Sequence, residues 1–329
     1  MSLKYTMSLE EFLAEWRNES LYVEVKTSGS TGEPKRMLVE KQRMRASARI
    51  TCDFLGLRSG DTALLCMPLD YIAGKMMVVR ALERDLRLTT VEPSGHPLAA
   101  EQGDGYTFAA MVPMQVYNSL QVPEERERLK GIRHLIIGGG AIDEALAEEL
   151  KLFPNNVWST YGMTETLSHI ALRRLSGPEA SEWYTPFPSV GVSLSEDDCL
   201  VIDAPEVCKE RLVTNDIAEL ATQSQTFRIL GRKDNVICSG GIKIQAEEVE
   251  RMLKAHLRVP YLISKKADRK FGEVVVLLTE GNVEEARTVC EAVLPKYQRP
   301  KAYVHVSEIP MTETKKPARR QAELLVNEI

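Results

Sequence analysis

The sequence has few of the residues that build metal centres and disulfide frameworks. Its 329 residues include six cysteines and five histidines. There is no Cys-x-x-Cys pair and no His-Glu-x-x-His motif, so a zinc site or a disulfide-stapled fold has little support. No apolar run is long enough to cross a bilayer, and the N-terminus lacks the pattern of a secretion signal. These absences predict free thiols in a cytoplasmic protein.

The sequence also lacks an excess of charge of either sign. Lys and Arg number 42 against 47 Asp and Glu, a formal net charge of -5, which gives no electrostatic case for binding nucleic acid or an anionic membrane. One basic stretch runs from Lys296 to Arg320, and it is either a solvated face or a contact for phosphate groups. A chain of this length that is 43% hydrophobic and 27% charged predicts a globular protein with two cores.

The N-terminal segment predicts a short helix, two strands joined by a glycine-rich loop, and a longer helix. Ser8 as the N-cap and Glu11 three residues later form a capping box. Strand-like segments at 21–26 and 36–41 flank the loop. The loop Thr27–Lys35, "TSGSTGEPK", therefore joins two strands.

The order of apolar patterns along the rest of the chain predicts a large α/β domain followed by a small α+β domain. Strand-length apolar runs alternate with helical patterns over residues 62–153, as in α/β layers. Short strands follow over 199–230, and the glycine-rich, charged stretch 231–241 then interrupts the pattern. We expect the domains to be residues 1–231 and 232–329.

The Thr27–Lys35 loop is suited to holding an anion without being a Walker loop. Gly29 and Gly32 are too close together, Arg36 follows the lysine, and Pro34 leads into an extended segment rather than a helix. Hydroxyls and backbone N–H groups that converge on one turn beside a Lys make an anion-binding concavity. A plain hairpin turn is the alternative. The candidate phosphate-binding residues are Thr27, Ser28, Gly29, Ser30, Thr31, Gly32 and Lys35.

A second polar cluster, "STYGMTET", follows a strand-like segment. Thr164 can give a hydroxyl to a phosphate oxygen, and Glu165 can give a carboxylate to a hard cation such as Mg²⁺. Tyr161 offers a flat face for a base. Further along, Asp216 in "TNDIAEL" could accept hydrogen bonds from ribose hydroxyls, although a structural turn Asp is equally common.

Five blocks together resemble the ordered motif set of the adenylate-forming superfamily, which contains acyl-CoA synthetases, adenylation domains and luciferases. The blocks are "TSGSTGEPK", "STYGMTET", "TNDIAEL", "GRKDNVICSGGIKIQAEEVE" and "IPMTETKKPARR", and they span nearly the whole chain. The resemblance implies that the glycine-rich loop holds the β- and γ-phosphates of ATP. It also implies that a carboxylate attacks the α-phosphorus of ATP to give an acyl-adenylate, from which a thiol, usually that of coenzyme A, displaces AMP.

The resemblance assigns nucleotide contacts by position. It implies Gly139, Gly140 and Ala141 around adenine, with Tyr161 packing on the base. It further implies Asp216 and Arg232 on the ribose, Thr164 on phosphate and Glu165 on Mg²⁺. The expected ligands are ATP, Mg²⁺, coenzyme A and a small-molecule acid, without nucleic acid or membrane insertion, and a homo-oligomer is possible.

The C-terminal domain is expected to be a mobile lid. The resemblance implies a hinge at Asp234, a coenzyme A channel beside Gly240 and Gly241, and a catalytic lysine at Lys316. Lys315 stands where the family usually has glycine, so which of the two lysines reaches the site is left open. Because the phosphate loop begins so early in the sequence, we expect much of the N-terminal subdomain of typical members to be absent.

The segment "PLDYIAGKMMVVRAL" indicates the acid. It resembles the o-succinylbenzoate-CoA ligases of menaquinone biosynthesis, which implies acid contacts from Tyr71, Lys75, Arg80 and Gly138. Tyr71 replaces a histidine found in many acyl-CoA synthetases. Two alternatives stay open: an enzyme that adenylates another aryl acid or an amino acid, the latter with Asp70 on the ammonium group, and a nucleotide-binding pseudoenzyme.

Overall fold

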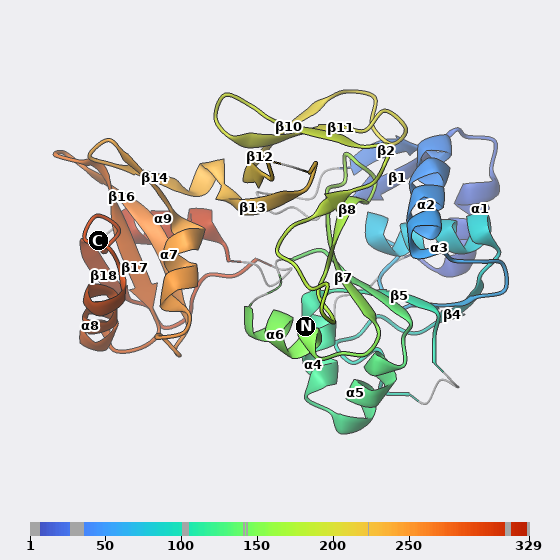
Figure 1. Cartoon of the computed structure of the whole chain (residues 1–329), viewed down its shortest axis with the longest axis horizontal. Coiled ribbons are helices and arrows are strands. Elements are labelled where there is room, and N and C mark those ends of the chain that lie inside the picture. Colours follow the sequence, from blue (N-terminus) through green and yellow to red (C-terminus); the bar gives the residue numbers. More distant parts are fainter. Residues whose placement is uncertain are drawn as a thin grey trace.

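The chain forms a larger body and a smaller C-terminal body (Figure 1). In this computed structural model, no helix among the described residues is both long and apolar enough to span a bilayer. The loop Thr27–Lys35, Ala141, Lys315 and Lys316 lie outside the described residues. The described residues are 7–26, 36–100, 105–140, 142, 144–222, 224–312 and 317–327.

A seven-stranded sheet forms the centre of the larger body. In spatial order it contains β4 (Arg87–Thr90), β3 (Thr62–Leu65), β5 (Phe108–Met111), β6 (His134–Ile137), β7 (Asn156–Gly162), β8 (His169–Arg174) and β9 (Thr185–Pro186). The pairing is parallel from β4 to β7 and antiparallel from β7 to β9. Every residue of β5 and β6 is buried, as expected of parallel strands covered on both faces. The predicted α/β layering is confirmed.

The helices described in the larger body are α1 (Leu9–Arg17), α2 (Lys41–Leu55), α3 (Ile72–Arg84), α4 (Pro113–Leu120), α5 (Pro123–Lys130) and α6 (Glu144–Lys151). Of these, α3 to α6 connect strands of the seven-stranded sheet. The predicted capping box begins α1, since the Ser8 hydroxyl accepts a bond from the Glu11 backbone N–H at 3.2 Å and the Glu11 carboxylate accepts one from Ser8. Helices α2 and α3 pack against each other, and α3 also contacts β3 and β4.

Two antiparallel sheets complete the larger body. Strands β1 (Tyr22–Lys26) and β2 (Arg36–Glu40) pair with Lys26 opposite Arg36, which confirms that the glycine-rich loop joins two strands. The other sheet has the order β10 (Gly191–Leu194), β11 (Cys199–Asp203), β12 (Leu212–Leu220) and β13 (Phe227–Arg232).

The smaller body is the predicted α+β unit. Its elements are β14 (Val236–Ser239), β15 (Ile242–Gln245), α7 (Ala246–Leu253), β16 (Tyr261–Asp268), β17 (Gly272–Thr279), α8 (Val283–Val293), β18 (Ala302–His305) and α9 (Arg319–Asn327). The strands of its sheet have the order β15-β14-β17-β16, and β18 pairs in parallel with β17.

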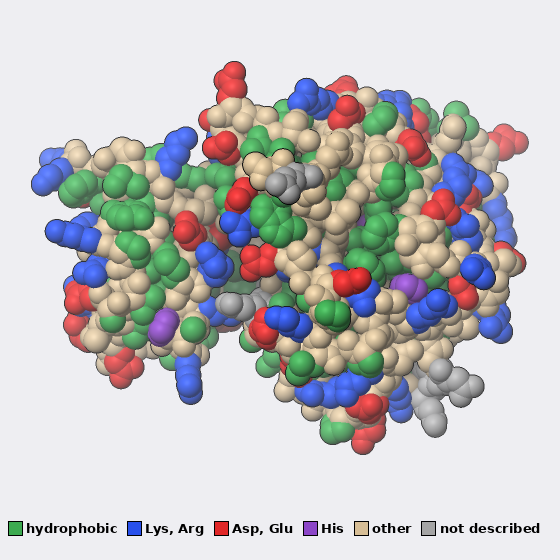
Figure 2. Space-filling view, in the orientation of Figure 1, with side chains coloured by type: hydrophobic (Ala, Val, Ile, Leu, Met, Phe, Trp, Pro, Cys, Tyr) green, Lys and Arg blue, Asp and Glu red, His purple; other side chains and the backbone are tan. Residues whose placement is uncertain are grey.

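The two bodies have separate hydrophobic cores. Buried apolar residues as far as Phe227 form one cluster, and those from Ile237 onward form two others. The short 3-10 helix η1 (Lys233–Asn235) lies between them, and Figure 2 shows a hollow between the bodies with acidic and basic side chains along it. We therefore propose the domain boundary at residue 232. Strand β13 ends at Arg232 rather than at the predicted Leu230, because Arg232 still pairs with Asp216 of β12.

Candidate active site

A tight turn between β7 and β8 presents Thr164 and Glu165. The buried Thr166 hydroxyl accepts a hydrogen bond from the Met163 N–H at 3.0 Å and lies 2.7 Å from the Ser168 carbonyl oxygen. These bonds close the turn from inside. Thr164 is left half-buried and Glu165 exposed, so their side chains are available to a ligand.

The Glu165 carboxylate fits a Mg²⁺ role. No cationic side chain among the described residues pairs with it, and no group of three His, Cys, Asp or Glu in the same part of the chain could hold a metal. Mg²⁺ commonly takes one or two protein carboxylates and completes its shell with substrate phosphates and water. A single free carboxylate beside the Thr164 hydroxyl is consistent with that mode of binding.

The structure brings Tyr161, Asp216 and Arg232 together. The Tyr161 hydroxyl donates to Asp216 Oδ2 at 2.6 Å, and Arg232 Nη1 donates to Asp216 Oδ1 at 3.0 Å. Burial and the Asp216 carboxylate raise the pKa of Tyr161, so the phenol remains protonated and keeps donating. Its ring contacts those of Phe227 and Tyr184, with centroids 5.1 and 5.7 Å away. These contacts hold an aromatic ring and a fixed carboxylate side by side; their expected roles toward a base and a ribose stay predictions.

The predicted adenine-binding glycines follow β6. Gly138, which was predicted to contact the acid, comes just before them, and a Cβ there would lie 2.4 Å from Thr160 Oγ1, so a larger residue would require the Thr160 side chain to shift. Its N–H donates to the Met111 carbonyl at 3.0 Å. Gly139 has a φ of +79°, a conformation that favours glycine. Gly139 and Gly140 carry no side chain that could cover their backbone, and they lie just after the end of β6.

The predicted hinge residue, Asp234, lies between the two bodies, and the predicted channel residues, Gly240 and Gly241, lie on the smaller body. Asp234 is in η1, where Arg232 Nη2 and Asn215 Nδ2 donate to its Oδ2 at 3.3 and 3.4 Å. Gly240 and Gly241 have φ values of +58° and +84° and form the two-residue turn of the β14–β15 hairpin. Their proposed roles in domain movement and coenzyme A access remain predictions.

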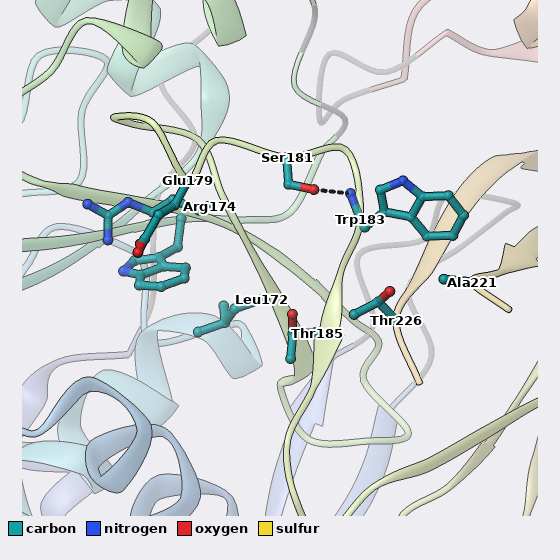
Figure 3. Close-up of a pocket in the computed structure, with 9 residues that line it drawn as sticks. Leu172, Arg174, Glu179, Ser181, Trp183, Thr185, Ala221 and Thr226 are labelled. Atoms are coloured by element: carbon teal, nitrogen blue, oxygen red, sulfur yellow. Dashed lines mark hydrogen bonds between the residues drawn. The ribbon is translucent and has the colours of Figure 1, made fainter. Parts of the chain in front are cut away.

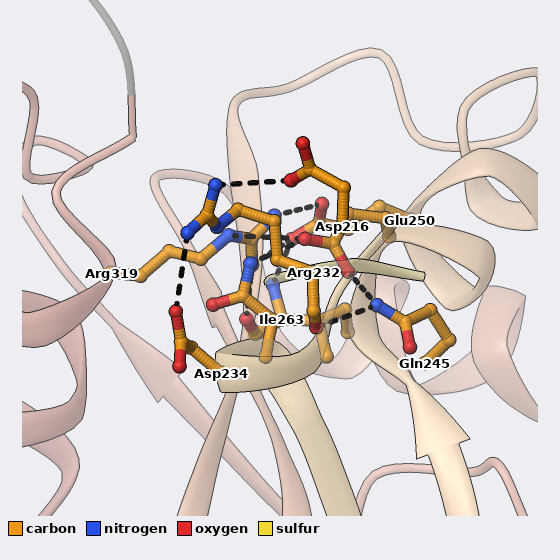
Figure 4. A network of polar contacts seen from close by, with 9 residues as sticks. Asp216, Arg232, Asp234, Gln245, Glu250, Ile263 and Arg319 are labelled. Carbon is orange, nitrogen blue, oxygen red and sulfur yellow. Dashed lines mark hydrogen bonds and ion pairs between the residues drawn. The ribbon is translucent and has the colours of Figure 1, made fainter. Parts of the chain in front are cut away.

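A network of polar contacts extends from Arg232, at the end of β13, to Arg319, at the start of α9 (Figure 4). Gln245 Nε2 donates to the Arg232 carbonyl at 3.0 Å and to Glu247 at 2.7 Å. Arg319 donates twice to Glu250, with Nη1–Oε1 at 3.0 Å and Nη2–Oε2 at 2.7 Å. Burial would lower the pKa of Arg319, but the bonds and charge of Glu250 outweigh it and raise that pKa. Arg319 therefore anchors the chain three residues after Lys316.

Arg80 is the most unusual charged residue of the larger body. It lies on α3 with 2% of its surface exposed. No carboxylate among the described residues pairs with it; Nη2 donates to Ser168 Oγ at 2.7 Å, Nη1 meets only the Met77 sulfur at 4.0 Å, and Nε has no partner. Burial lowers its pKa to about 10, which leaves the guanidinium charged at neutral pH. The motif pattern did not single out Ser168, because it follows the "TET" block without a signal of its own.

Two other predicted acid-binding residues differ in their surroundings. The Lys75 ammonium is buried and donates to Glu15 Oε2 at 3.1 Å and to the Glu24 carbonyl at 2.8 Å. Those contacts account for its charge, so we propose a structural rather than a substrate-binding role for Lys75. Tyr71 is the half-buried N-cap residue of α3, at the start of the helix that carries Arg80.

A separate pocket lies at the β8–β9 end of the sheet (Figure 3). It has a volume of about 360 Å³, and the Arg174 guanidinium stacks on Trp158 with a centroid distance of 4.9 Å. Arg174 and Glu179 lie on one side and Trp183 on the other. None of the predicted site residues lines this pocket, so we assign it no role in the reaction.

Comparisons with known proteins agree with the motif order. A family model described as AMP-binding enzyme matches residues 10–221. The 2-succinylbenzoate–CoA ligases of Bacillus cereus and Bacillus cytotoxicus are 28% and 27% identical, over 97% and 92% of this chain and 72% and 69% of their own length.

Solved structures give the same result. An acyl-CoA synthetase (AMP-forming)/AMP-acid ligase II-like protein from Dyadobacter fermentans is 34% identical, with a TM-score of 0.66 over 94% of this chain and 91% of that one. The o-succinylbenzoate coenzyme A synthetase of Bacillus subtilis, in complex with ATP and magnesium ion, is 23% identical, with a TM-score of 0.74 over 91% and 69% of the two chains, and shares the fold. The expected resemblance is confirmed, and the chain belongs to the AMP-binding enzyme family.

Proposed function

We propose that this protein is an AMP-forming acid–CoA ligase whose acid is o-succinylbenzoate, and that it acts in menaquinone biosynthesis. In the first half of the reaction, a carboxylate oxygen attacks the α-phosphorus of ATP and the bond to pyrophosphate breaks. In the second half, the thiol of coenzyme A attacks the acyl carbon and AMP leaves. The first half brings two anions together, so positioning and charge neutralisation account for most of its catalysis.

One observation carries the choice of acid: the Arg80 guanidinium is buried and has no carboxylate partner among the described residues. A buried charge is costly unless it is paired and hydrogen-bonded. An acid with a second carboxylate would supply the missing anion, and the planar fork of Arg suits a carboxylate. Arg80 lies beside the turn that presents Thr164 and Glu165, since it bonds to Ser168 at the end of that turn.

The apolar surroundings of Arg80 suit the rest of o-succinylbenzoate. Met76 and Val79 lie within one turn of Arg80 on α3 and are fully buried. Apolar side chains around a single cation are the surroundings that suit an aromatic ring carrying two carboxylates and a keto group. The names of the Bacillus relatives agree with this acid.

The other residues have proposed roles in holding ATP. Tyr161 and the backbone of Gly139 and Gly140 contact the base, while Asp216 and Arg232 bind the ribose. Glu165 would hold Mg²⁺, which neutralises phosphate charge when bound, and Thr164 binds phosphate. The loop Thr27–Lys35 and Lys316 would bind the pyrophosphate group and the α-phosphate, respectively.

Acid-dependent exchange of labelled pyrophosphate into ATP tests this proposal over a panel of o-succinylbenzoate, benzoate and the common amino acids. We expect exchange with o-succinylbenzoate well above that with any other acid. Faster exchange with an amino acid would favour an amino-acid-adenylating enzyme. No exchange with any acid, in a protein that binds ATP, would favour a nucleotide-binding pseudoenzyme.

A further inference from the structure

From Arg80, a chain of hydrogen bonds runs through three further side chains and ends on a backbone carbonyl. Arg80 Nη2 lies 2.7 Å from Ser168 Oγ, and Ser168 Oγ lies 3.1 Å from His169 Nδ1. On the other side of the imidazole, His169 Nε2 lies 3.1 Å from Thr51 Oγ1, which in turn donates to the Ser47 carbonyl at 3.1 Å. Thr51 is fully buried, and His169 is 7% exposed. The chain of hydrogen bonds joins α3, the start of β8 and α2.

The donors and acceptors along this chain of hydrogen bonds fix its direction. Thr51 uses its hydroxyl hydrogen on the Ser47 carbonyl, so its oxygen must accept a hydrogen bond from His169 Nε2. His169 Nδ1 is then an acceptor and takes the hydrogen of the Ser168 hydroxyl. The Ser168 oxygen accepts from Arg80. The hydroxyl hydrogens of Thr51 and Ser168 and the imidazole N–H of His169 each find an acceptor, as is expected of buried polar groups.

This arrangement requires a neutral imidazole. A protonated His169 would donate through both nitrogens, and the Ser168 hydroxyl would have no acceptor among the described residues. Burial and the Arg80 charge keep the pKa of His169 well below its ordinary value. The groups that hold Arg80 are therefore neutral, and they orient the guanidinium without cancelling its charge.

We propose that Ser168, His169 and Thr51 are positioning residues, a one-way hydrogen-bond chain that orients Arg80 and leaves its positive charge for the second carboxylate of the acid. This inference rests on the proposed function. A carboxylate in place of the chain would hold Arg80 equally well, but it would neutralise the charge and compete with the substrate. Because the residues of the chain are neutral, they can fix the guanidinium in place and still leave its charge to select a diacid.

The test compares KM and kcat for o-succinylbenzoate and benzoate in wild type, Ser168→Ala, Thr51→Val and Thr51→Ser. We expect Ser168→Ala to raise KM for o-succinylbenzoate about tenfold, the size of one charge-assisted hydrogen bond, with kcat and the KM for ATP unchanged. Thr51→Val should raise the same KM by about threefold, and Thr51→Ser should behave as wild type because it keeps the hydroxyl. Benzoate, which lacks the second carboxylate, should be used equally by all four proteins.

Ser176→Ala is the matched control. Its fully buried hydroxyl also accepts a hydrogen bond from an arginine, Arg174 Nε at 3.0 Å. Its other bonds are to the backbone of Val157 and Asn155 rather than to Arg80 or His169. It should leave the ratio of the two KM values unchanged. If Ser176→Ala changed this ratio as much as Ser168→Ala does, loss of any buried hydroxyl would be sufficient to produce the effect, and the proposal would be overturned.

The imidazole supplies a readout apart from activity. Nitrogen NMR of the wild-type protein labelled at histidine should show His169 as the neutral Nε2–H tautomer. A protonated ring or the Nδ1–H tautomer would overturn the chain. If wild type does not prefer o-succinylbenzoate to benzoate, the proposed acid is wrong; if it does and Ser168→Ala keeps that preference, only the positioning chain is wrong.

Discussion

At the scale of single residues, we propose that the buried charge of Arg80 controls which acid the site accepts. Arg80→Lys keeps a cation at this position but loses the planar pair of donors that matches a carboxylate. We expect it to weaken use of o-succinylbenzoate by about 1–3 kcal/mol, the range for a hydrogen bond to a charged group. The KM for ATP should not change. Steady-state kinetics with o-succinylbenzoate and benzoate measure both effects.

Arg84→Lys is the matched control for that change. Arg84 lies on the same helix, and its guanidinium pairs at the surface with Asp53. Surface ion pairs contribute little, so this variant should keep the kinetics of wild type. An Arg80→Lys enzyme that uses o-succinylbenzoate as well as wild type would remove Arg80 from the acid site.

Glu165 provides the second prediction at this scale. Glu165→Gln preserves the shape of the side chain but removes the charge that a Mg²⁺ ion requires. We expect loss of Mg²⁺-dependent pyrophosphate exchange by at least about a hundredfold, the size of a lost transition-state contact, with an unchanged unfolding midpoint because the carboxylate is exposed. A well-folded variant with the Mg²⁺ dependence of wild type would contradict the assignment.

At the scale of elements, local signals predicted the start of α1, where Ser8 and Glu11 form the capping box. The helix that carries Arg80 was expected from the family resemblance. Burial of that helix on several sides was not predictable, since its charged residues read equally well as a surface face. The partner of Arg80, Ser168, is 88 residues away, and Thr51 is 118 residues from His169. Such contacts depend on packing between elements, which a local pattern does not contain.

The pair between α7 and α9 yields a prediction about stability. Glu250→Gln removes the carboxylate that both Arg319 bonds require, and it leaves the mostly buried guanidinium poorly paired. We expect the free energy of unfolding of the C-terminal body to fall by about 2 kcal/mol, as for a lost hydrogen bond to a charged group. Urea denaturation followed by a probe in that body measures the change.

Glu284→Gln is the control in the same body. Its exposed pair with Arg287 should contribute no more than about 0.5 kcal/mol. Equal effects from Glu250→Gln and Glu284→Gln would mean that the α7–α9 pair is no stronger than a surface contact.

At the scale of the whole molecule, we propose that the two half-reactions need the smaller body in different places. Hinges are a few element-terminal residues that absorb changes in φ and ψ, and Asp234 lies between β13 and β14. Asp234→Pro fixes φ near -65°, so we expect it to slow thioester formation from supplied acyl-adenylate far more than adenylate formation. Stopped-flow assays of the separate halves measure this.

Asp234→Ala separates the backbone effect from the side chain. It loses the contacts with Arg232 and Asn215 but leaves φ free, and it should affect both halves alike and weakly. If Asp234→Pro slows both halves equally, a local folding defect explains the loss and the hinge assignment is wrong.

Lys316 should act in only one of the halves. Its charge helps where the α-phosphate develops charge, so Lys316→Ala should slow adenylate formation by about a hundredfold or more and spare thioester formation from supplied acyl-adenylate. Lys315→Ala serves as the control beside it. If Lys315→Ala lost adenylate formation and Lys316→Ala kept it, Lys315 rather than Lys316 would be the catalytic lysine.

The fate of the carboxylate oxygen tests the central claim most directly. The protein is given o-succinylbenzoate labelled with oxygen-18 in its carboxylates, together with ATP, Mg²⁺ and coenzyme A, and the AMP is analysed by mass spectrometry. Attack of the carboxylate on the α-phosphorus predicts one labelled oxygen in each AMP and a coenzyme A thioester of the acid. Unlabelled AMP, or no AMP from this acid, would contradict the account.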